Sequence, residues 1–202
     1  MIPLPLRHSC LVALLLLAGC SVLPKAEPVQ TYLLPSSQIK ASNQSLSTSL
    51  SISRPQASLT LDSTRIAVVP QGSEITNYQG ARWSDPAPAL LRDQLLEAFQ
   101  NDGRFAALSS DMQHLHSDYK LIGNLLAFQS EYQDGRPEAS IRFDARLVRS
   151  RDQSVLASRS FVIRQPTQDA QVPAVVQAFG QASDRLAEQL LEWTTSQIRK
   201  AP

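Results

Sequence analysis

Beyond its first thirty residues, the chain alternates between short runs with strand periodicity and two long stretches with helical periodicity. Residues 65–70 form a β-branched run that ends at a proline, which is typical of a strand. Residues 141–147 are apolar at every second position, with Arg142, Asp144 and Arg146 between, and predict a strand with one solvated face. Further strands are predicted at 31–34, 50–53, 105–108, 119–132 and 155–164.

The first helical stretch covers residues 87–101. Asp85-Pro86 precedes it and Gly103 follows it, as is typical of a helix start and a helix end. Apolar residues at three- and four-residue spacing predict its buried face, namely Leu91, Leu95, Ala98 and Phe99. The opposite, solvated face is predicted to carry Arg92, Asp93 and Glu97.

The second helical stretch covers residues 172–197. Its apolar stripe consists of Val175, Phe179, Ala182, Leu186, Leu190 and Trp193. A stripe of this kind usually packs on a sheet, although docking on a partner protein gives the same pattern.

The order of elements predicts the fold class. Turn signals at Asp134-Gly135 and Asp152-Gln153 join the last three strands into an antiparallel meander. Strands, helix, meander and helix in this order predict an α+β domain, a mostly antiparallel sheet with two main helices packed on one face. The predicted domain covers residues 31–202, with a flexible loop at about 36–49, where Ser, Gln and Asn predominate.

The N-terminus has the pattern of a bacterial lipoprotein signal. Arg7 precedes a short apolar run, and Leu17-Ala18-Gly19-Cys20 resembles the lipobox. Residues 1–19 are therefore interpreted as a signal peptide and residues 20–30 as a tether. An ordinary signal peptide that happens to contain Cys20 is the alternative.

The lipobox resemblance implies that Cys20 becomes the first mature residue and carries N-acyl and S-diacylglycerol chains. The only other cysteine, Cys10, lies in the segment to be removed, so the mature chain has no disulfide partner for Cys20. Ser21, rather than an aspartate, follows the cysteine and favours sorting to the outer membrane. The predicted location is the cell envelope, lipid-anchored and facing the periplasm.

Charge and motifs argue against several kinds of function. Without residues 1–19 the chain carries 18 basic and 18 acidic side chains, so a nucleic acid is a poor candidate partner. No nucleophile elbow and no Gly-rich phosphate loop occur in the sequence. His114 and His116 could share a face of a strand as metal ligands, but a solvated loop is the favoured interpretation. The sequence therefore predicts no enzyme, no metal and no cofactor apart from the lipid on Cys20.

Residues 75–88 (ITNYQGARWSDPAP) gather polar and aromatic side chains around Gly80. We interpret this stretch as a structural corner in which Gly80 permits a sharp bend and Pro86 starts the helix. Trp83 is expected to bury its ring against the sheet, and Arg82 to stack over an aromatic ring or pair with an acid. A docking loop for a partner, involving Tyr78, Arg82, Trp83 and Pro86, is the alternative.

Taken together, the lipobox, the segment Thr31-Tyr32-Leu33-Leu34-Pro35, the strand RIAVVP and the run YQGARWSDPAPALLRDQLLEAFQNDGRF resemble the ABC-type transport auxiliary lipoproteins, the PqiC-like family. In that family Tyr78, Arg82, Trp83 and Pro86 would take the places of a tyrosine, an Arg-Trp pair and a helix-starting proline. The resemblance implies a non-catalytic subunit that accompanies an ATPase, a permease and a periplasmic protein with an MCE domain.

The resemblance also implies movement of phospholipids or other hydrophobic molecules between the two membranes, with this subunit docking the MCE protein at the outer membrane. It permits a homo-oligomer. A structural or assembly lipoprotein that supports an outer-membrane complex is the main alternative, and an envelope hydrolase is a further one.

Overall fold

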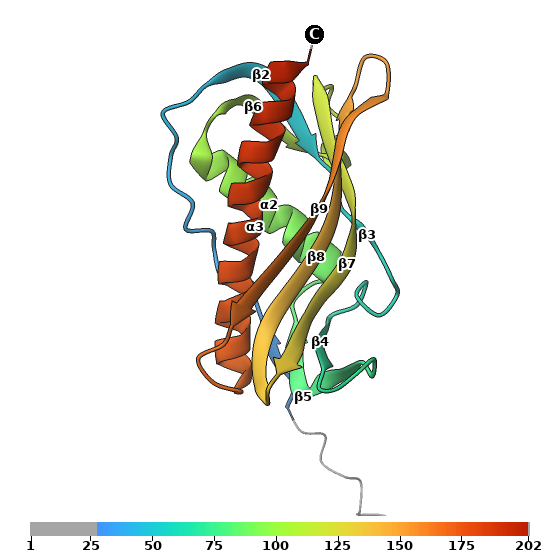
Figure 1. Cartoon of the computed structure of the whole chain (residues 1–202), viewed down its shortest axis with the longest axis vertical. Helices are drawn as coiled ribbons and strands as arrows, with labels where there is room; N and C mark the ends of the chain where they lie inside the picture. Colours follow the sequence, from blue (N-terminus) through green and yellow to red (C-terminus); the bar gives the residue numbers. More distant parts are fainter. Residues whose placement is uncertain (1–27, 202) are drawn as a thin grey trace, which may run out of the picture.

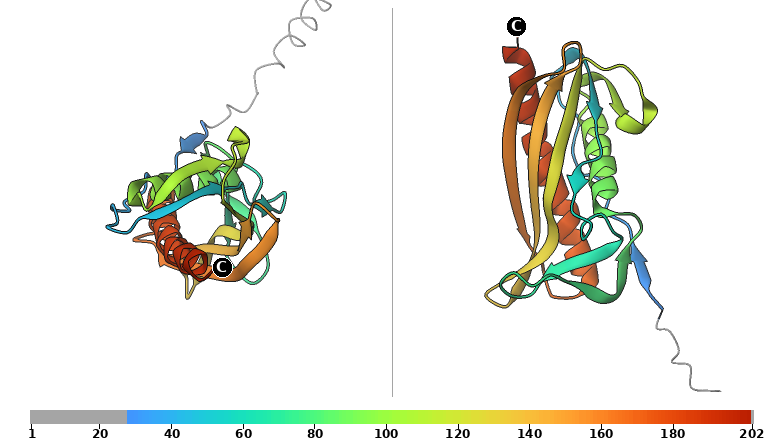
Figure 2. Two further views of the ribbon diagram at one scale, coloured as in Figure 1. Left: turned by 90° about the horizontal axis from the view of Figure 1, so that it is seen from above. Right: turned by 90° about the vertical axis from the view of Figure 1, so that its right-hand side faces the viewer.

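The computed structural model describes residues 28–201. They form one nine-stranded sheet that curls into a half-barrel, and two α-helices that close its open side (Figures 1 and 2). The α+β class is thus confirmed. The predicted signal peptide, Cys20, Ser21 and most of the predicted tether lie outside the described residues.

The strands and helices agree closely with the predicted segments. The helices are α2 (Ala87–Asp102) and α3 (Val172–Lys200), and a short 3-10 helix, η2, covers Asp111–Gln113. The strands are β1 (Gln30–Tyr32), β2 (Leu46–Ile52), β3 (Gln56–Ala57), β4 (Arg65–Val69), β5 (Thr76–Trp83), β6 (Phe105–Ser110), β7 (Tyr119–Gln133), β8 (Arg136–Arg149) and β9 (Ser154–Pro166).

The sheet is mixed, and the prediction that it is mostly antiparallel was wrong. The predicted meander exists, because β8 pairs antiparallel with both β7 and β9. The other edge of β7, however, receives three parallel partners in succession, β2, β3 and β4. Strands β2 and β6 are also parallel, as are β1 and β5. Strand β7 is long enough to serve as the common partner of strands that lie far apart in the sequence.

Helix α2 begins after Pro86 and ends at Gly103, whose φ of 72° is the left-handed conformation that glycine adopts most easily. Its predicted apolar face is buried. Arg92 was predicted on the solvated face, but it is only 8% exposed. Its guanidinium bonds to Asp93, the next residue, and to the sulfur of Met112, so the turn that follows β6 covers this part of the helix.

Helix α3 packs on β8 and β9 and also contacts α2. Every residue of its predicted apolar stripe is buried, so the stripe packs within the domain. At the centre of the core, Phe179 stacks on Phe128 of β7, and Trp83 of β5 meets the edges of both rings.

Residues 33–45, here called the strap, run from β1 across the helices to β2 (Figure 1). The predicted loop at 36–49 is irregular only up to residue 45, since 46–49 already belong to β2. The strap is fastened to α3 by Asp184, which accepts hydrogen bonds from the Ser37 hydroxyl at 2.7 Å and from the Gln38 amide at 2.9 Å. One turn earlier, the ring of Pro35 lies against Gly180.

We expect Gly180→Ala to lower the free energy of unfolding by about 1–3 kcal/mol, the usual cost of overpacking. A methyl group at position 180 would lie 2.9 Å from two ring atoms of Pro35, which opposes the gain in helix propensity from alanine. Urea denaturation provides the measurement. If the clash is the cause, Gly180→Ala should cost much less in a Pro35→Gly background; an equal cost there would contradict this explanation.

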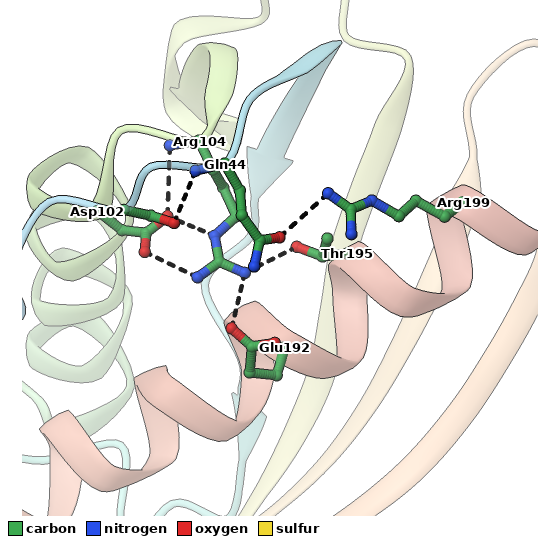
Figure 3. A network of polar contacts seen from close by, with 7 residues as sticks. Gln44, Asp102, Arg104, Glu192, Thr195 and Arg199 are labelled. Atoms are coloured by element: carbon green, nitrogen blue, oxygen red, sulfur yellow. Dashed lines mark hydrogen bonds and ion pairs between the residues drawn. The ribbon is translucent and has the colours of Figure 1, made fainter.

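A polar network centred on the buried Arg104 joins both helices, and at its edge Gln44 of the strap accepts a hydrogen bond from Arg199 of α3 (Figure 3). Arg104, the residue before β6, is 5% exposed and bonds to both carboxylate oxygens of Asp102. It also donates to Glu192 at 2.9 Å and to the hydroxyl of Thr195 at 3.1 Å, both on α3. The neighbouring hydrogen bonds of Asp102 and Glu192 raise the pKa of Arg104, so the guanidinium is held charged.

Candidate functional site: the signature strands and the tether pole

The segments that resemble the transport auxiliary lipoproteins come together in three neighbouring strands. Strand β5 lies between β1, with which it is parallel, and β4, with which it is antiparallel. Tyr32 is in register with Trp83, and Thr31 with Arg82. The amide of Ser84 then donates to the carbonyl of Tyr32. Sequence motifs that lie some fifty residues apart are therefore adjacent in the fold.

The stretch 75–88 is a strand followed by a helix start, and the predicted sharp bend does not lie at Gly80. Gly80 has a φ of 65° inside β5, where the pairing with β4 skips from Arg82↔Arg65 to Asn77↔Ala67. This irregularity is a bulge, for which a glycine with positive φ is well suited. The turn into α2 comes later, between Trp83 and Pro86.

Trp83 is 1% exposed and fills the space between β7 and α3. Pro86 precedes the first residue of α2, and a second proline, Pro88, lies in the first helical turn. Trp83 and Pro86 therefore each have a structural role, in the core and at the start of α2. Whether the segment also binds a partner stays a prediction.

Arg82 neither stacks on an aromatic ring nor pairs with an acid among the described residues. Its Nε instead donates to the Thr31 hydroxyl at 3.0 Å, which links β5 to β1. The side chain is exposed because it lies on the outer face of the sheet, next to the short edge strand. Of Tyr78, Arg82, Trp83 and Pro86, Arg82 is the one that a partner could reach most easily.

Tyr78 lies on β5 with its hydroxyl 3.1 Å from that of Ser130, a fully buried residue of β7. Burial is the main reason why the pKa of Tyr78 is raised to about 12, and Tyr132 adds to the rise, whereas the bond with Ser130 opposes it. The neutral phenol is therefore the form that the fold favours.

We expect a spectrophotometric titration at 295 nm to show one phenol ionising near pH 12. Because folding raises this pKa, Tyr78 contributes stability below pH 10 that is lost as the pH rises toward 12. Tyr78→Phe should remove the phenol ionisation near pH 12 and make the free energy of unfolding less dependent on pH between 10 and 12. Tyr32→Phe, a change on the exposed edge strand, should leave that ionisation in place; its loss there would contradict the assignment.

The described chain begins at the same end of the molecule as β1, the β4–β5 loop and the β7–β8 turn, and α3 ends at the opposite end (Figure 1). We call these ends the tether pole and the distal pole. At the tether pole, a cavity of about 530 Å³ is lined by the β4–β5 loop, the ends of β7 and β9, and Arg142 in the middle of β8. Its lining includes Val69, Ile75, Gln129, Glu131, Arg142 and Arg164.

His114 and His116 lie at the distal pole in the exposed loop after η2. Met112, in η2 itself, and Leu115, in the loop, are 69% and 61% exposed. Within residues 28–201, no group of three or more His, Cys, Asp or Glu side chains could hold a metal ion. In the same residues, no helix combines the length and the apolar character needed to cross a membrane.

The sequence predicts that residues 75–88 are important but does not predict the residues that contact them or the neighbouring cavity. Ser130 and Asp184 are ordinary polar residues in the sequence, and only the packing of β7 on β5 and of the strap on α3 gives them their contacts. The cavity is formed by residues from four separate segments, so no local pattern could predict it.

A family model and several known proteins are similar to this chain. The model of the ABC-type transport auxiliary lipoprotein component matches residues 32–190. A crystal structure of a Xanthomonas campestris protein is similar, with a TM-score of 0.78 and 32% identity over 85% of this chain and 98% of that one. A second solved structure, of an uncharacterized protein, has a TM-score of 0.65 at 17% identity, covering 83% of this chain and 99% of the other, and shows the shared fold.

A relative from Bradyrhizobium diazoefficiens, described as an uncharacterized protein, is 31% identical over 153 residues. These residues are 75% of the present chain and 40% of the relative, so the chain spans about two fifths of that protein's length.

Proposed function

Because the chain belongs to the ABC-type transport auxiliary lipoprotein family, we propose that it is a non-catalytic subunit that docks a periplasmic MCE-domain protein at the outer membrane. The proposed system includes an ABC permease and an ATPase and moves phospholipids or other hydrophobic molecules across the envelope. The family match over residues 32–190 is the observation that carries this proposal, and the lipobox at residues 17–20 supports it.

The two poles suggest how the docking is arranged. A lipid on Cys20 would hold the tether pole near the membrane, because Cys20 is eight residues from Pro28, the first described residue. The distal pole would then face the periplasm. It carries the exposed Met112 and Leu115, and apolar side chains of this kind commonly anchor protein interfaces. We therefore propose η2 and the loop after it as the main contact, and Arg82 as the alternative.

Site-specific photo-crosslinking in intact cells tests this proposal. A photoreactive residue at position 115, and in a second variant at position 82, should capture a partner that mass spectrometry identifies. Position 126, also exposed but on the outer face of β7, serves as the control. An MCE protein captured from 115 or 82 and not from 126 supports docking. Capture of an outer-membrane barrel alone would favour the structural role, and no MCE protein from any position would contradict the proposal.

The proposed outer-membrane location gives a prediction for Ser21. In an enterobacterial host, Ser21→Asp should move most of the protein to the inner membrane, because aspartate after the lipidated cysteine retains lipoproteins there. Sucrose-gradient fractionation followed by immunoblotting provides the measurement. Ser21→Asn is the matched control without the charge. If the aspartate variant still fractionated with the outer membrane, Ser21 would not determine the membrane to which the protein is sorted.

A further inference from the structure

The tether-pole cavity contains an arginine, Arg142, that makes no ion pair within the part of the chain that the structure describes. The cavity's other arginine, Arg164, is already held by two carboxylates, since its guanidinium lies 3.7 Å from Glu131 and 2.9 Å from Glu138 just outside the cavity. Arg142 is different. Within residues 28–201, no carboxylate lies within 4.0 Å of its guanidinium, and the side chain is exposed.

The remaining lining combines hydrogen-bonding and apolar groups. The amide of Gln129 donates to Glu131 at 3.0 Å, and its carbonyl oxygen takes no part in that bond. Val69 and Ile75 add apolar surface to the lining, and Ile75 is 42% exposed. Among residues 28–201, the lining therefore combines one arginine outside any ion pair with two apolar side chains.

The position of the cavity limits what can reach it. An extended chain spans at most about 3.5 Å per residue, so the eight residue-to-residue steps from Cys20 to Pro28 cover at most about 28 Å. A protein anchored by lipid at Cys20 would therefore keep the tether pole within one bilayer thickness of the headgroups. Phospholipid headgroups would be the most concentrated source of phosphate near this cavity.

We propose that the tether-pole cavity binds the headgroup of a membrane phospholipid. The guanidinium of Arg142 binds two phosphate oxygens, an arrangement that its planar fork fits well. Val69 and Ile75 contact the glycerol end of the lipid. This proposal rests on the proposed lipid anchoring and names the substrate class that this subunit itself would contact.

Native mass spectrometry of the full-length acylated protein, released from a non-ionic detergent, tests the site. The added probe is dihexanoylphosphatidylglycerol, with inorganic phosphate as a competitor. We expect a one-to-one lipid adduct whose apparent Kd rises at least tenfold in Arg142→Gln. Arg146→Gln is the matched control, because Arg146 is exposed on the same face of β8 but does not line the cavity. That control should bind lipid within twofold of the unchanged protein.

Ile75→Ser separates a lipid site from a phosphate site. It should weaken the lipid adduct several-fold and leave the weak competition by inorganic phosphate unchanged. Inorganic phosphate that competes as strongly as the lipid would overturn the lipid assignment, and equal losses in both arginine variants would show that only general charge attraction is involved. The absence of any adduct would also refute the proposal. None of these results would affect crosslinking to an MCE protein, so the two proposals can fail separately.

Discussion

Trp83→Ala should lower the free energy of unfolding by about 3–5 kcal/mol, the range for truncating a large buried aromatic residue. The ring is 1% exposed and makes edge contacts with Phe128 at 6.0 Å and with Phe179 at 5.4 Å between ring centroids. Alanine would leave a cavity where β5, β7 and α3 meet. Guanidinium denaturation, followed by circular dichroism, is the measurement.

Two further variants distinguish lost core packing at Trp83 from lost binding to a partner. Trp83→Phe should cost clearly less, because it keeps an aromatic ring and removes an indole N–H that has no hydrogen-bond partner in the described structure. Arg82→Ala should change stability by less than about 1 kcal/mol, since it removes only one exposed hydrogen bond. If Trp83→Ala folded with normal stability and lost only the crosslink to a partner, the docking interpretation of this residue would replace the structural one.

Arg104→Met should destabilise the protein by about 3–5 kcal/mol, because it leaves the carboxylate of Asp102 buried without its counter-ion. Asp102 is 3% exposed, and its side-chain bonds run to the guanidinium and the amide of Arg104. The variant also removes the links to Glu192 and Thr195, so the C-terminal part of α3 should lose protection in hydrogen exchange before the sheet does.

A double replacement distinguishes an unpaired charge from lost packing. Asp102→Leu combined with Arg104→Met removes both charges and should cost clearly less than Arg104→Met alone. Arg54→Ala is the exposed control, since the Arg54–Asp62 pair is about one third exposed on both sides and should contribute at most about 1 kcal/mol. Equal costs for the single and the double variants would show that the buried charge is not the cause.

The sequence predicts most elements of this fold but not the way in which the strands pair. The meander is visible because β7, β8 and β9 are joined by short turns at Asp134-Gly135 and near Gln153, so neighbours in sequence are neighbours in the sheet. The parallel strand pairs are not joined by short turns, so no local sequence feature predicts them. Strands β2 and β4 meet the opposite edge of β7 across more than fifty residues, and β2 meets β6 across α2.

For single side chains in the candidate site, too, the sequence does not predict contacts made by distant segments. The pattern in residues 75–88 correctly marks the start of α2, but the bend expected at Gly80 is a bulge inside a strand. Arg92 appeared solvated on the helical wheel and is covered by the turn that contains Met112. In each case a segment distant in the sequence supplies the contact, and periodicity within one element cannot reveal it.

The pairing of β1 has a mechanical consequence. A lipid anchor would pull on the chain through Pro28, along the direction of a strand that is hydrogen-bonded parallel to β5. Such a pull loads the β1–β5 bonds in shear, all at once, and does not open them one at a time from an end. Should β1 yield, the load would pass along the strap to Pro35, Ser37 and Gln38, which are held by α3. The domain would then resist force at two successive attachments before its core is exposed.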